Sequence, residues 1–285
     1  MEAKQRLPDW LRRPIQTDES YVEVHRLLKE GNLHTVCEDA KCPNRHECWN
    51  QGTATFMILG NVCTRNCRFC NVSTGRPDKV DLGEPERVAQ AAEKLGLRHV
   101  VVTSVTRDDL SDGGSEIFVK TILAIRRRLP SVSVEVLTPD FKGNRDDLYR
   151  VLDAAPAVFN HNIETVERLQ QPIRQTATYE CSLNVLKRAS EYGKKIKIKS
   201  GIMVGLGETD DEIVQTLKDL FENGVRLLTI GQYLAPTRDH VRTKRFVTPQ
   251  EFVDLEKQAY ALGFESVASG PLVRSSYHAQ QMLSE

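Results

Sequence analysis

The chain has 285 residues, of which 40% are hydrophobic and 27% charged, and its 39 basic side chains balance 39 acidic ones. A chain of this length and composition folds as one large α/β domain or two small ones. Zero net charge argues against a nucleic acid or a membrane surface as the main partner. No apolar stretch approaches the roughly 18–20 residues of a membrane-spanning helix. Because residues 1–10 also lack a signal-peptide core, we expect a cytoplasmic protein without a membrane partner.

The first predicted element is an amphipathic helix over residues 19–29, where apolar residues recur at helical spacing. A cysteine-rich segment follows it, since six of the seven cysteines fall between Cys37 and Cys70. In a reducing compartment, clustered cysteines bind metal more often than they form disulfides. The segment therefore predicts metal sites, whereas Cys181 lies in a helical pattern and is expected to pack as an ordinary residue.

The first cysteine set consists of Cys37, Cys42 and Cys48, which are separated by four and five residues, with no fourth cysteine close by. His34 and His46 lie near enough to suggest a zinc site. Zinc sites usually pair their ligands at gaps of two to four residues, so this spacing fits zinc poorly. We interpret both histidines as loop residues, and His46 as a metal ligand is the alternative.

The second cysteine set consists of Cys63, Cys67 and Cys70, which are separated by three and two residues after the apolar run 56–60. A short loop can direct three thiolates to one point, as an iron–sulfur cluster requires. No further cysteine or histidine follows before His99, so one iron of such a cluster would have no protein ligand. An open iron of this kind can bind a substrate or a cofactor. A zinc knuckle or a group of reduced, buried cysteines is the alternative interpretation.

From residue 53 onward, the hydrophobic pattern alternates between buried strands and helices. Strands are predicted at 55–59, 99–104, 132–137, 158–163, 196–204 and 227–233, and helices at 85–95, 115–129, 145–155, 179–192, 210–223 and 249–262. Six successive strand–helix units favour parallel strands closed wholly or partly into a barrel, although a complete barrel has eight. A dinucleotide-binding fold is disfavoured, because no Gly-x-Gly-x-x-Gly follows the first strand.

The fifth predicted strand has two different faces. Ile198 and Ile202 share one face, and Lys199, Gly201 and Met203 share the other. Because the outer face of a helix-wrapped barrel must be apolar, we expect the second face to line the lumen. There the glycine would allow close approach of a ligand, the lysine would offer charge to a carboxylate, and the methionine would offer an apolar surface to an adenine. The alternative is an edge strand with solvated lysines.

Polar residues follow the predicted strands at the ends where barrel proteins place their sites. Thr103 and Ser104 end the second strand, Asn162 and Glu164 follow the fourth, and a glycine-rich turn ends the fifth. Each end alone is an ordinary turn or cap signal, but their coincidence favours a ligand site. Arg174 is interpreted either as a partner for a ligand carboxylate or as a surface ion pair.

The spacing C-x3-C-x2-C, with an aromatic residue before the last cysteine, resembles the signature of the radical S-adenosylmethionine (SAM) superfamily. The resemblance implies a partial, splayed (β/α)6 barrel of the TIM type. It also implies a [4Fe–4S] cluster on the second cysteine set, whose open iron chelates SAM so that a 5′-deoxyadenosyl radical can form. The residues then expected to bind SAM are Phe69, Thr103, Ser104, Asn162, Glu164, Arg174 and Met203.

Two further motifs narrow the resemblance. Residues 274–277 read Arg-Ser-Ser-Tyr, and together with the first cysteine set they resemble the lipoyl synthase family over nearly the whole chain. The resemblance implies a sulfurtransferase that inserts two sulfur atoms, at C6 and C8 of an octanoyl chain on a lysine of a carrier protein. The first cysteine set would hold a second, sulfur-donating [4Fe–4S] cluster, with Ser276 as its fourth ligand and Arg274 as support. Ser275 is the alternative ligand, since adjacent residues of an extended segment point to opposite sides.

The resemblance also implies partners and boundaries. The partners would be lipoyl domains of 2-oxoacid dehydrogenases and the glycine cleavage H protein, with a ferredoxin or flavodoxin as electron donor. An N-terminal extension (1–52) and a C-terminal tail (266–285) would cover the site of the barrel (53–265). The alternatives are another radical SAM enzyme and a non-enzymatic zinc or electron-transfer module. Methylthiotransferases carry extra domains for which this chain has no room, and biotin synthase lacks the first cysteine set.

Overall fold

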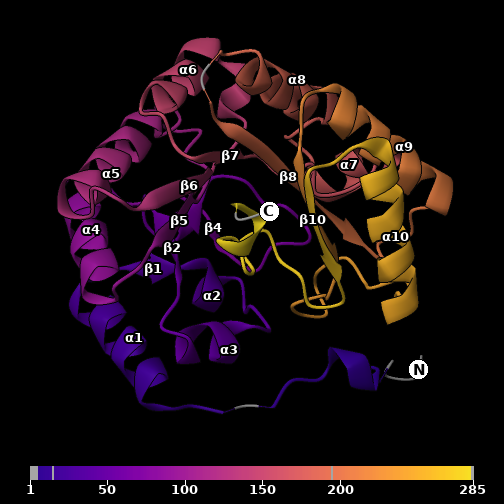
Figure 1. Cartoon of the computed structure of the whole chain (residues 1–285), viewed down its shortest axis with the longest axis horizontal. Helices are drawn as coiled ribbons and strands as arrows, with labels where there is room; N and C mark the ends of the chain where they lie inside the picture. Colours follow the sequence, from indigo (N-terminus) through magenta and orange to yellow (C-terminus); the bar gives the residue numbers. More distant parts are fainter. Residues whose placement is uncertain (1–5, 15, 194, 284–285) are drawn as a thin grey trace.

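The structure is a computed structural model that describes residues 6–14, 16–193 and 195–283. The predicted extensions, 1–52 and 266–285, include residues 1–5, 15 and 284–285, which lie outside the described residues. Figure 1 shows a ring of helices around a strongly curved sheet, with the N-terminal helices on one side of the ring. Within the described ranges, no helix is both long and apolar enough to cross a membrane.

The central sheet of the described chain has eight strands, in the order β1-β2-β5-β6-β7-β8-β9-β10. The parallel strands are β2 (Thr55–Ile58), β5 (His99–Ser104), β6 (Ser133–Leu137), β7 (Val158–Asn160), β8 (Lys197–Val204), β9 (Leu227–Gln232) and β10 (Ser266–Gly270). The first edge strand, β1 (His34–Thr35), pairs antiparallel with β2. Because β1 and β10 are the two edges of this described sheet, the barrel is open. The predicted partial α/β barrel is confirmed, with β10 as an additional parallel strand.

The helices after the strands pack against the outside of the sheet (Figure 1). They are α4 (Glu84–Lys94), α5 (Ser115–Arg128), α6 (Arg145–Asp153), α7 (Glu167–Arg174), α8 (Tyr179–Ser190), α9 (Asp210–Glu222) and α10 (Pro249–Leu262). Local sequence determines where two of them begin, since Thr209 and Thr248 each form a capping box with the glutamate three residues later. All but α7 were predicted, with ends that differ by up to two residues.

The elements that sequence reasoning missed are short or contain unfavourable residues. Helix α7 contains Pro172, which disfavours a helix interior. Strand β10 consists of Ser-Val-Ala-Ser-Gly, which has little apolar signal, and it exists because it pairs with β9. Further short elements are α2 (Val36–Asp39), α3 (Arg45–Asn50), β3 (Val62–Cys63), β4 (Ser73–Thr74), and the 3-10 turns η1 (Asp9–Leu11), η2 (Phe141–Gly143) and η3 (Gln281–Leu283).

The chain segments outside the barrel pack on its edge and inside it. Helix α1 (Glu19–Glu30) begins at an Asp18 cap and buries Val24 and Leu28 in the main core. At the other end of the chain, the yellow turn η3 lies in the middle of the ring (Figure 1). Met282 of this turn packs against Val158 and Leu227, which begin β7 and β9. The tail therefore runs from the carboxyl end of β10 back to the opposite end of the barrel.

Candidate active site

A cavity of about 820 Å³ lies within the curved sheet and brings the predicted site residues together. Its walls come from the N-terminal cysteine segment, from strands β2, β5, β6, β8 and β9 with the loops that follow them, and from the C-terminal tail. The predicted residues that line it are Cys37, Cys42, Cys48, Cys63, Cys67, Phe69, Cys70, Thr103, Ser104, Asn162, Glu164, Arg174, Met203, Arg274, Ser275 and Ser276. Residues from three separate parts of the chain thus meet at one place.

The loop 63–70 lies beyond the carboxyl end of β2, and its backbone forms hydrogen bonds on both sides. The N–H of Arg68 donates to the carbonyl of Ile173 in α7, at 2.8 Å. On the other side, Nε2 of His240 donates to the carbonyl of Cys70, at 2.9 Å. These contacts hold the second cysteine set at the end of the barrel where such folds place their chemistry.

The first cysteine set lies near the opposite end of β2. Thr35 caps the short helix α2, which carries Cys37, and α3 carries Cys48. The Cys37 thiol accepts a hydrogen bond from the backbone of Thr55, the first residue of β2. Because the second set follows the end of this strand, β2 separates the two sets.

The thiols of each set lie close enough to influence one another. Burial raises the pKa of Cys37 to about 11 and that of Cys48 to about 12, and the thiols of the first set add to these increases. Burial likewise raises the pKa of Cys67 to about 11 and that of Cys70 to about 12, with a contribution from the second set. All are free thiols. They must lose protons to bind iron, so cluster binding will release protons.

The arrangement of the cysteines differs from that of a single-ion site. Among the residues that the structure describes, no three His, Cys, Asp or Glu side chains are placed to hold one metal ion. A tetrahedral zinc site needs all its sulfurs about 2.3 Å from the same ion. A [4Fe–4S] cluster makes a different demand, because each thiolate binds a separate iron and the sulfurs stand further apart. Three free thiols that face one cavity fit the cluster.

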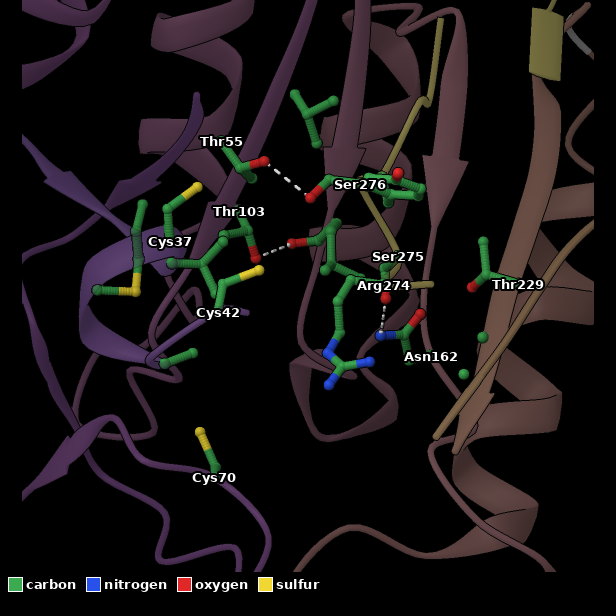
Figure 2. A pocket seen from close by; sticks show the side chains of 18 of the residues that line it. Cys37, Cys42, Thr55, Cys70, Thr103, Asn162, Thr229, Arg274, Ser275 and Ser276 are labelled. Atoms are coloured by element: carbon green, nitrogen blue, oxygen red, sulfur yellow. Dashed lines mark hydrogen bonds between the residues drawn. The ribbon is translucent and has the colours of Figure 1, made fainter. Parts of the chain in front are cut away.

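The two tail serines point to different partners, as Figure 2 shows. Oγ1 of Thr55 donates to Oγ of Ser276, at 2.8 Å, and the same threonine donates its backbone hydrogen bond to Cys37. Nδ2 of Asn162, beyond the end of β7, donates to Oγ of Ser275, at 2.7 Å. Ser276 therefore lies on the side of the first cysteine set, and Ser275 lies on the side of the strand ends.

Arg274 is half-buried beside the first cysteine set (Figure 2). Burial lowers its pKa, and Cys42 opposes that shift. Burial raises the pKa of Cys42 in turn, and Arg274 opposes it. Nη1 of Arg274 also donates to the carbonyl of Val273, at 2.7 Å. The guanidinium is thus available to stabilise negative charge at this end of the cavity.

Several buried polar atoms of the predicted SAM-binding residues have no hydrogen-bond partner within the described chain. They are Oγ of Ser104, Oδ1 of Asn162 and Nε of Arg174. The alternative that Arg174 forms a surface ion pair is wrong, since its side chain is buried and donates to the carbonyl of Ile163. Burial raises the pKa of Glu164, and Arg174 opposes that rise. Since buried polar groups are nearly always paired, these atoms fit a ligand with amino and carboxylate groups, as SAM has.

The apolar side of the cavity and the glycine of the fifth predicted strand lie as the sequence predicts, but the lysine of that strand does not. Phe69 and Met203 pack against a small cluster that includes Tyr233, which suits the flat face of an adenine. A side chain at Gly201 would place its Cβ 2.5 Å from Oγ1 of Thr229, so only glycine leaves this space open. The expectation that Lys199 offers charge to a ligand is wrong. It is fully buried, and its Nζ donates to Glu135 at 2.9 Å.

The remaining candidates lie outside the cavity lining. His46 stacks on Tyr21, with ring centroids 5.0 Å apart, and its Nδ1 lies 3.2 Å from the carbonyl of Gln16. Cys181 is half-buried on α8. The histidine is therefore a packing residue of the N-terminal segment.

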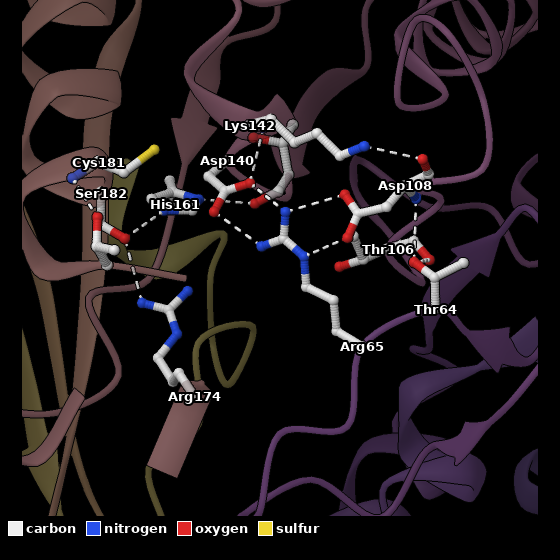
Figure 3. Close-up of polar contacts among 12 residues, drawn as sticks. Thr64, Arg65, Thr106, Asp108, Asp140, Lys142, His161, Arg174, Cys181 and Ser182 are labelled. Atoms are coloured by element: carbon white, nitrogen blue, oxygen red, sulfur yellow. Dashed lines mark hydrogen bonds and ion pairs between the residues drawn. The ribbon is translucent and has the colours of Figure 1, made fainter. Parts of the chain in front are cut away.

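Sequence reasoning missed a buried polar network around Arg65, which stands between Cys63 and Cys67 (Figure 3). Arg65 bridges Asp108 and Asp140, which follow β5 and β6. Further along, His161 Nδ1 lies 2.9 Å from the carbonyl of Thr138. The sequence did contain a signal for the bridge between Arg65 and the two aspartates. An arginine stands between two motif cysteines, and an aspartate follows each of two successive strands.

Comparison with known proteins shows the class of enzyme to which this chain belongs. Residues 57–220 match the radical SAM superfamily, and residues 1–42 match the N-terminal domain of lipoyl synthase of the radical SAM family. The crystal structure of methylornithine synthase (PylB) shares the fold, with a TM-score of 0.53 and 14% identity, over 88% of this chain and 79% of that one. Together with the open barrel, these matches define a radical SAM enzyme.

Similarity over nearly the full length identifies the family. The chain is 57% identical over 274 residues to the lipoyl synthase of Rubrobacter xylanophilus, covering 96% of this chain and 85% of that protein. It is 53% identical over 281 residues to the lipoyl synthase of Halalkalibacterium halodurans, covering 98% and 93%. The chain belongs to the lipoyl synthase family. The predicted sulfurtransferase activity of this type, with SAM and [4Fe–4S] clusters as cofactors, is thereby confirmed.

Proposed function

We propose that the two cysteine sets hold two clusters with separate tasks in sulfur insertion. Cys63, Cys67 and Cys70 hold the SAM-cleaving cluster, and the first set with Ser276 holds the sulfur-donating one. The observation that carries this proposal is that both sets line one cavity from the two ends of β2. A substrate chain between them would be within reach of both.

When bound, the clusters and SAM supply the hydrogen-abstracting 5′-deoxyadenosyl radical and the sulfur, chemistry that side chains alone cannot provide. The protein's residues bind and orient SAM and the substrate, and they exclude water. Ser104, Asn162 and Arg174 offer polar atoms to the amino acid part of SAM, and Phe69 and Met203 offer the apolar surface for its adenine. Thr103 and Glu164 line the same end of the cavity and complete the proposed SAM site.

The substrate proposed is an octanoyl chain on a carrier-protein lysine. Apolar side chains of the strands, among them Met57, Val101 and Leu137, line the cavity and suit a saturated chain. We propose lipoyl domains of 2-oxoacid dehydrogenases and the glycine cleavage H protein as the carriers. A ferredoxin or flavodoxin would be the electron donor, and the cytoplasm would be the location. The extension 1–52 and the tail 266–285 would act as covers of the barrel 53–265.

The test is anaerobic turnover with SAM, a reductant and an octanoyl-lysine peptide, followed by mass spectrometry. Cys67→Ala should abolish 5′-deoxyadenosine, because it removes a ligand of the SAM-cleaving cluster. Cys42→Ala should still cleave SAM, but it should stop sulfur insertion because the donor cluster is lost. Wild-type lipoyl formation by Cys42→Ala would refute the division of tasks.

A further inference from the structure

Arg65 stands between two cysteines of the second set, yet its side chain turns away from solvent into the protein. Its exposed side-chain fraction is 7%. Nε donates to Asp108 at 2.7 Å and Nη1 donates to Asp140 at 2.8 Å, while Nη2 donates to both, at 3.0 and 2.7 Å. Figure 3 shows the guanidinium between the two carboxylates. One side chain therefore fastens the cysteine loop to the segments that follow β5 and β6.

The bridge joins a positively charged guanidinium to negatively charged carboxylates. Burial alone would raise the pKa of Asp140, but the hydrogen bond and the charge of Arg65, with smaller contributions from neighbouring groups, together outweigh it, and the pKa falls to about 2. Planar guanidinium–carboxylate pairs with two parallel hydrogen bonds fix geometry more strictly than a lysine does. The bridge is thus a rigid joint that stays ionised at neutral pH.

The bridge aligns backbone donors with one sulfur. The N–H of Thr106 donates to Sγ of Cys63 at 3.3 Å, and the N–H of Arg65 donates to the same sulfur at 3.4 Å. Thr64 reinforces this alignment, because its Oγ1 donates to the carbonyl of Thr106 and accepts from the N–H of Asp108, each at 3.0 Å. The loop and the segment after β5 are therefore held so that two N–H groups point at Cys63.

Hydrogen bonds to cluster sulfurs help to set the reduction potential of an iron–sulfur cluster. They favour the reduced state, because that state carries one more negative charge. We propose that Arg65 is a positioning residue that raises the reduction potential of the SAM-cleaving cluster by holding the two N–H groups against Cys63. This inference rests on the proposed assignment of that cluster to the second cysteine set.

The test is a potentiometric titration of the full-length holoenzyme, followed by electron paramagnetic resonance. The signal to follow is the one that changes when SAM is added, since only a cluster with an open iron binds SAM. Arg65→Lys keeps the positive charge but cannot bridge both carboxylates. We expect unchanged iron content and a more negative midpoint potential. At a fixed solution potential at which little of the cluster is reduced, a tenfold smaller reduced fraction corresponds to a midpoint potential about 59 mV more negative for one electron.

Two further variants make the result decisive. Arg68→Lys changes an exposed arginine of the same loop and should keep the wild-type midpoint. Thr64→Val changes no charge and removes the hydroxyl that joins Thr106 to Asp108, so it should shift the midpoint in the same direction as Arg65→Lys. If Arg65→Lys does not assemble, Thr64→Val decides the question. Intact clusters with wild-type midpoints in both variants would overturn the inference alone. A wild-type protein without a SAM-sensitive signal would overturn the cluster assignment as well.

Discussion

At the scale of single residues, the two adjacent tail serines have different surroundings. Ser276 accepts from Thr55, next to Cys37, whereas Ser275 accepts from Asn162. The sequence expectation of an extended segment is wrong, because residues 274–277 form a turn in which the N–H of Tyr277 donates to the carbonyl of Arg274 at 2.9 Å. The turn still directs the two serine side chains to different partners. This contact favours Ser276 as the proposed fourth ligand.

The serine proposal predicts a separation of assembly from turnover. A serine oxygen is a harder donor than thiolate and matches iron–sulfur clusters less well, so its bond should break easily. Ser276→Cys should therefore assemble the cluster but slow or block sulfur insertion. Iron and labile sulfide counts with timed mass spectrometry of the peptide would measure both effects. Ser275→Ala serves as the control and should be milder. Sulfur insertion by Ser276→Cys at the wild-type rate would contradict the assignment.

His161 predicts a pH dependence of stability. Burial, followed by the nearby charge of Arg174, lowers its pKa to about 4. Because a carbonyl can only accept, Nδ1 donates to Thr138 and Nε2 accepts from Ser182, which defines the neutral form. A depressed folded pKa gives stability that is present above the unfolded value near 6.5 and is lost as pH falls towards 4.

The change expected from His161 between pH 7 and pH 5 is a loss of about 2 kcal/mol in the free energy of unfolding. Anaerobic urea unfolding at a series of pH values would measure it. His161→Gln keeps a neutral polar group at the site, and its free energy of unfolding should fall by about 2 kcal/mol less than that of the wild type between pH 7 and pH 5. Equal slopes in the two proteins would mean that His161 does not remain neutral in the fold.

At the scale of elements, the tail is fastened to the cysteine segment by side chains next to the cysteines themselves. Nδ2 of Asn44 donates to the carbonyl of Leu272 at 2.7 Å. The hydroxyl of Tyr277 donates to Oε1 of Glu47, also at 2.7 Å. Asn44 and Glu47 lie between Cys42 and Cys48, so the tail and the first cysteine set form one unit.

Tyr277→Phe should loosen this unit. Loss of a hydrogen bond to a charged group costs roughly 1.5–3 kcal/mol, which should speed iron release from the first site and leave the SAM-sensitive signal unchanged. Chelator-driven iron loss, followed by absorbance and electron paramagnetic resonance, would show this. Tyr179→Phe is a matched control, since that hydroxyl donates to Asp219 at 2.8 Å on the outer helices. Equal iron loss from the two variants would exclude a role for the contact.

At the scale of the whole molecule, the proposed covers carry the first cysteine set and the tail on short elements. Helices α2 and α3 have four and six residues, far too short to be stable alone. The barrel strands and helices form most of one continuous core, to which Val24, Leu28 and Trp49 of the N-terminal segment also contribute. Iron should therefore stabilise the covers more than the barrel.

Removal of iron should expose the covers to proteolysis first. After anaerobic chelation, we expect early cleavage within 36–50 and 271–283, while 84–262 stays resistant. Limited proteolysis with peptide mapping, with and without chelator, would locate the cuts. Early cleavage spread evenly through the barrel would contradict this division of stability.

Sequence patterns predicted the elements whose formation is local. Six strand–helix units follow from hydrophobic periodicity, and capping residues such as Thr209 and Thr248 determine where helices start. The two cysteine sets and residues 274–277 indicated the family, because the spacing of motif residues can be read directly from the sequence. The roles proposed for them follow from that spacing and from the family resemblance.

Only the tertiary structure decided which distant groups meet. Strand β10 forms because β9 offers it an edge, and Lys199 is neutralised because Glu135 stands opposite it on β6. The Arg65 bridge needs two loops that are 32 residues apart in sequence, counted from Asp108 to Asp140, to meet the cysteine loop. Local propensity carries no information about such contacts. They depend on how parallel strands align their carboxyl ends, and on a tail that returns through the barrel.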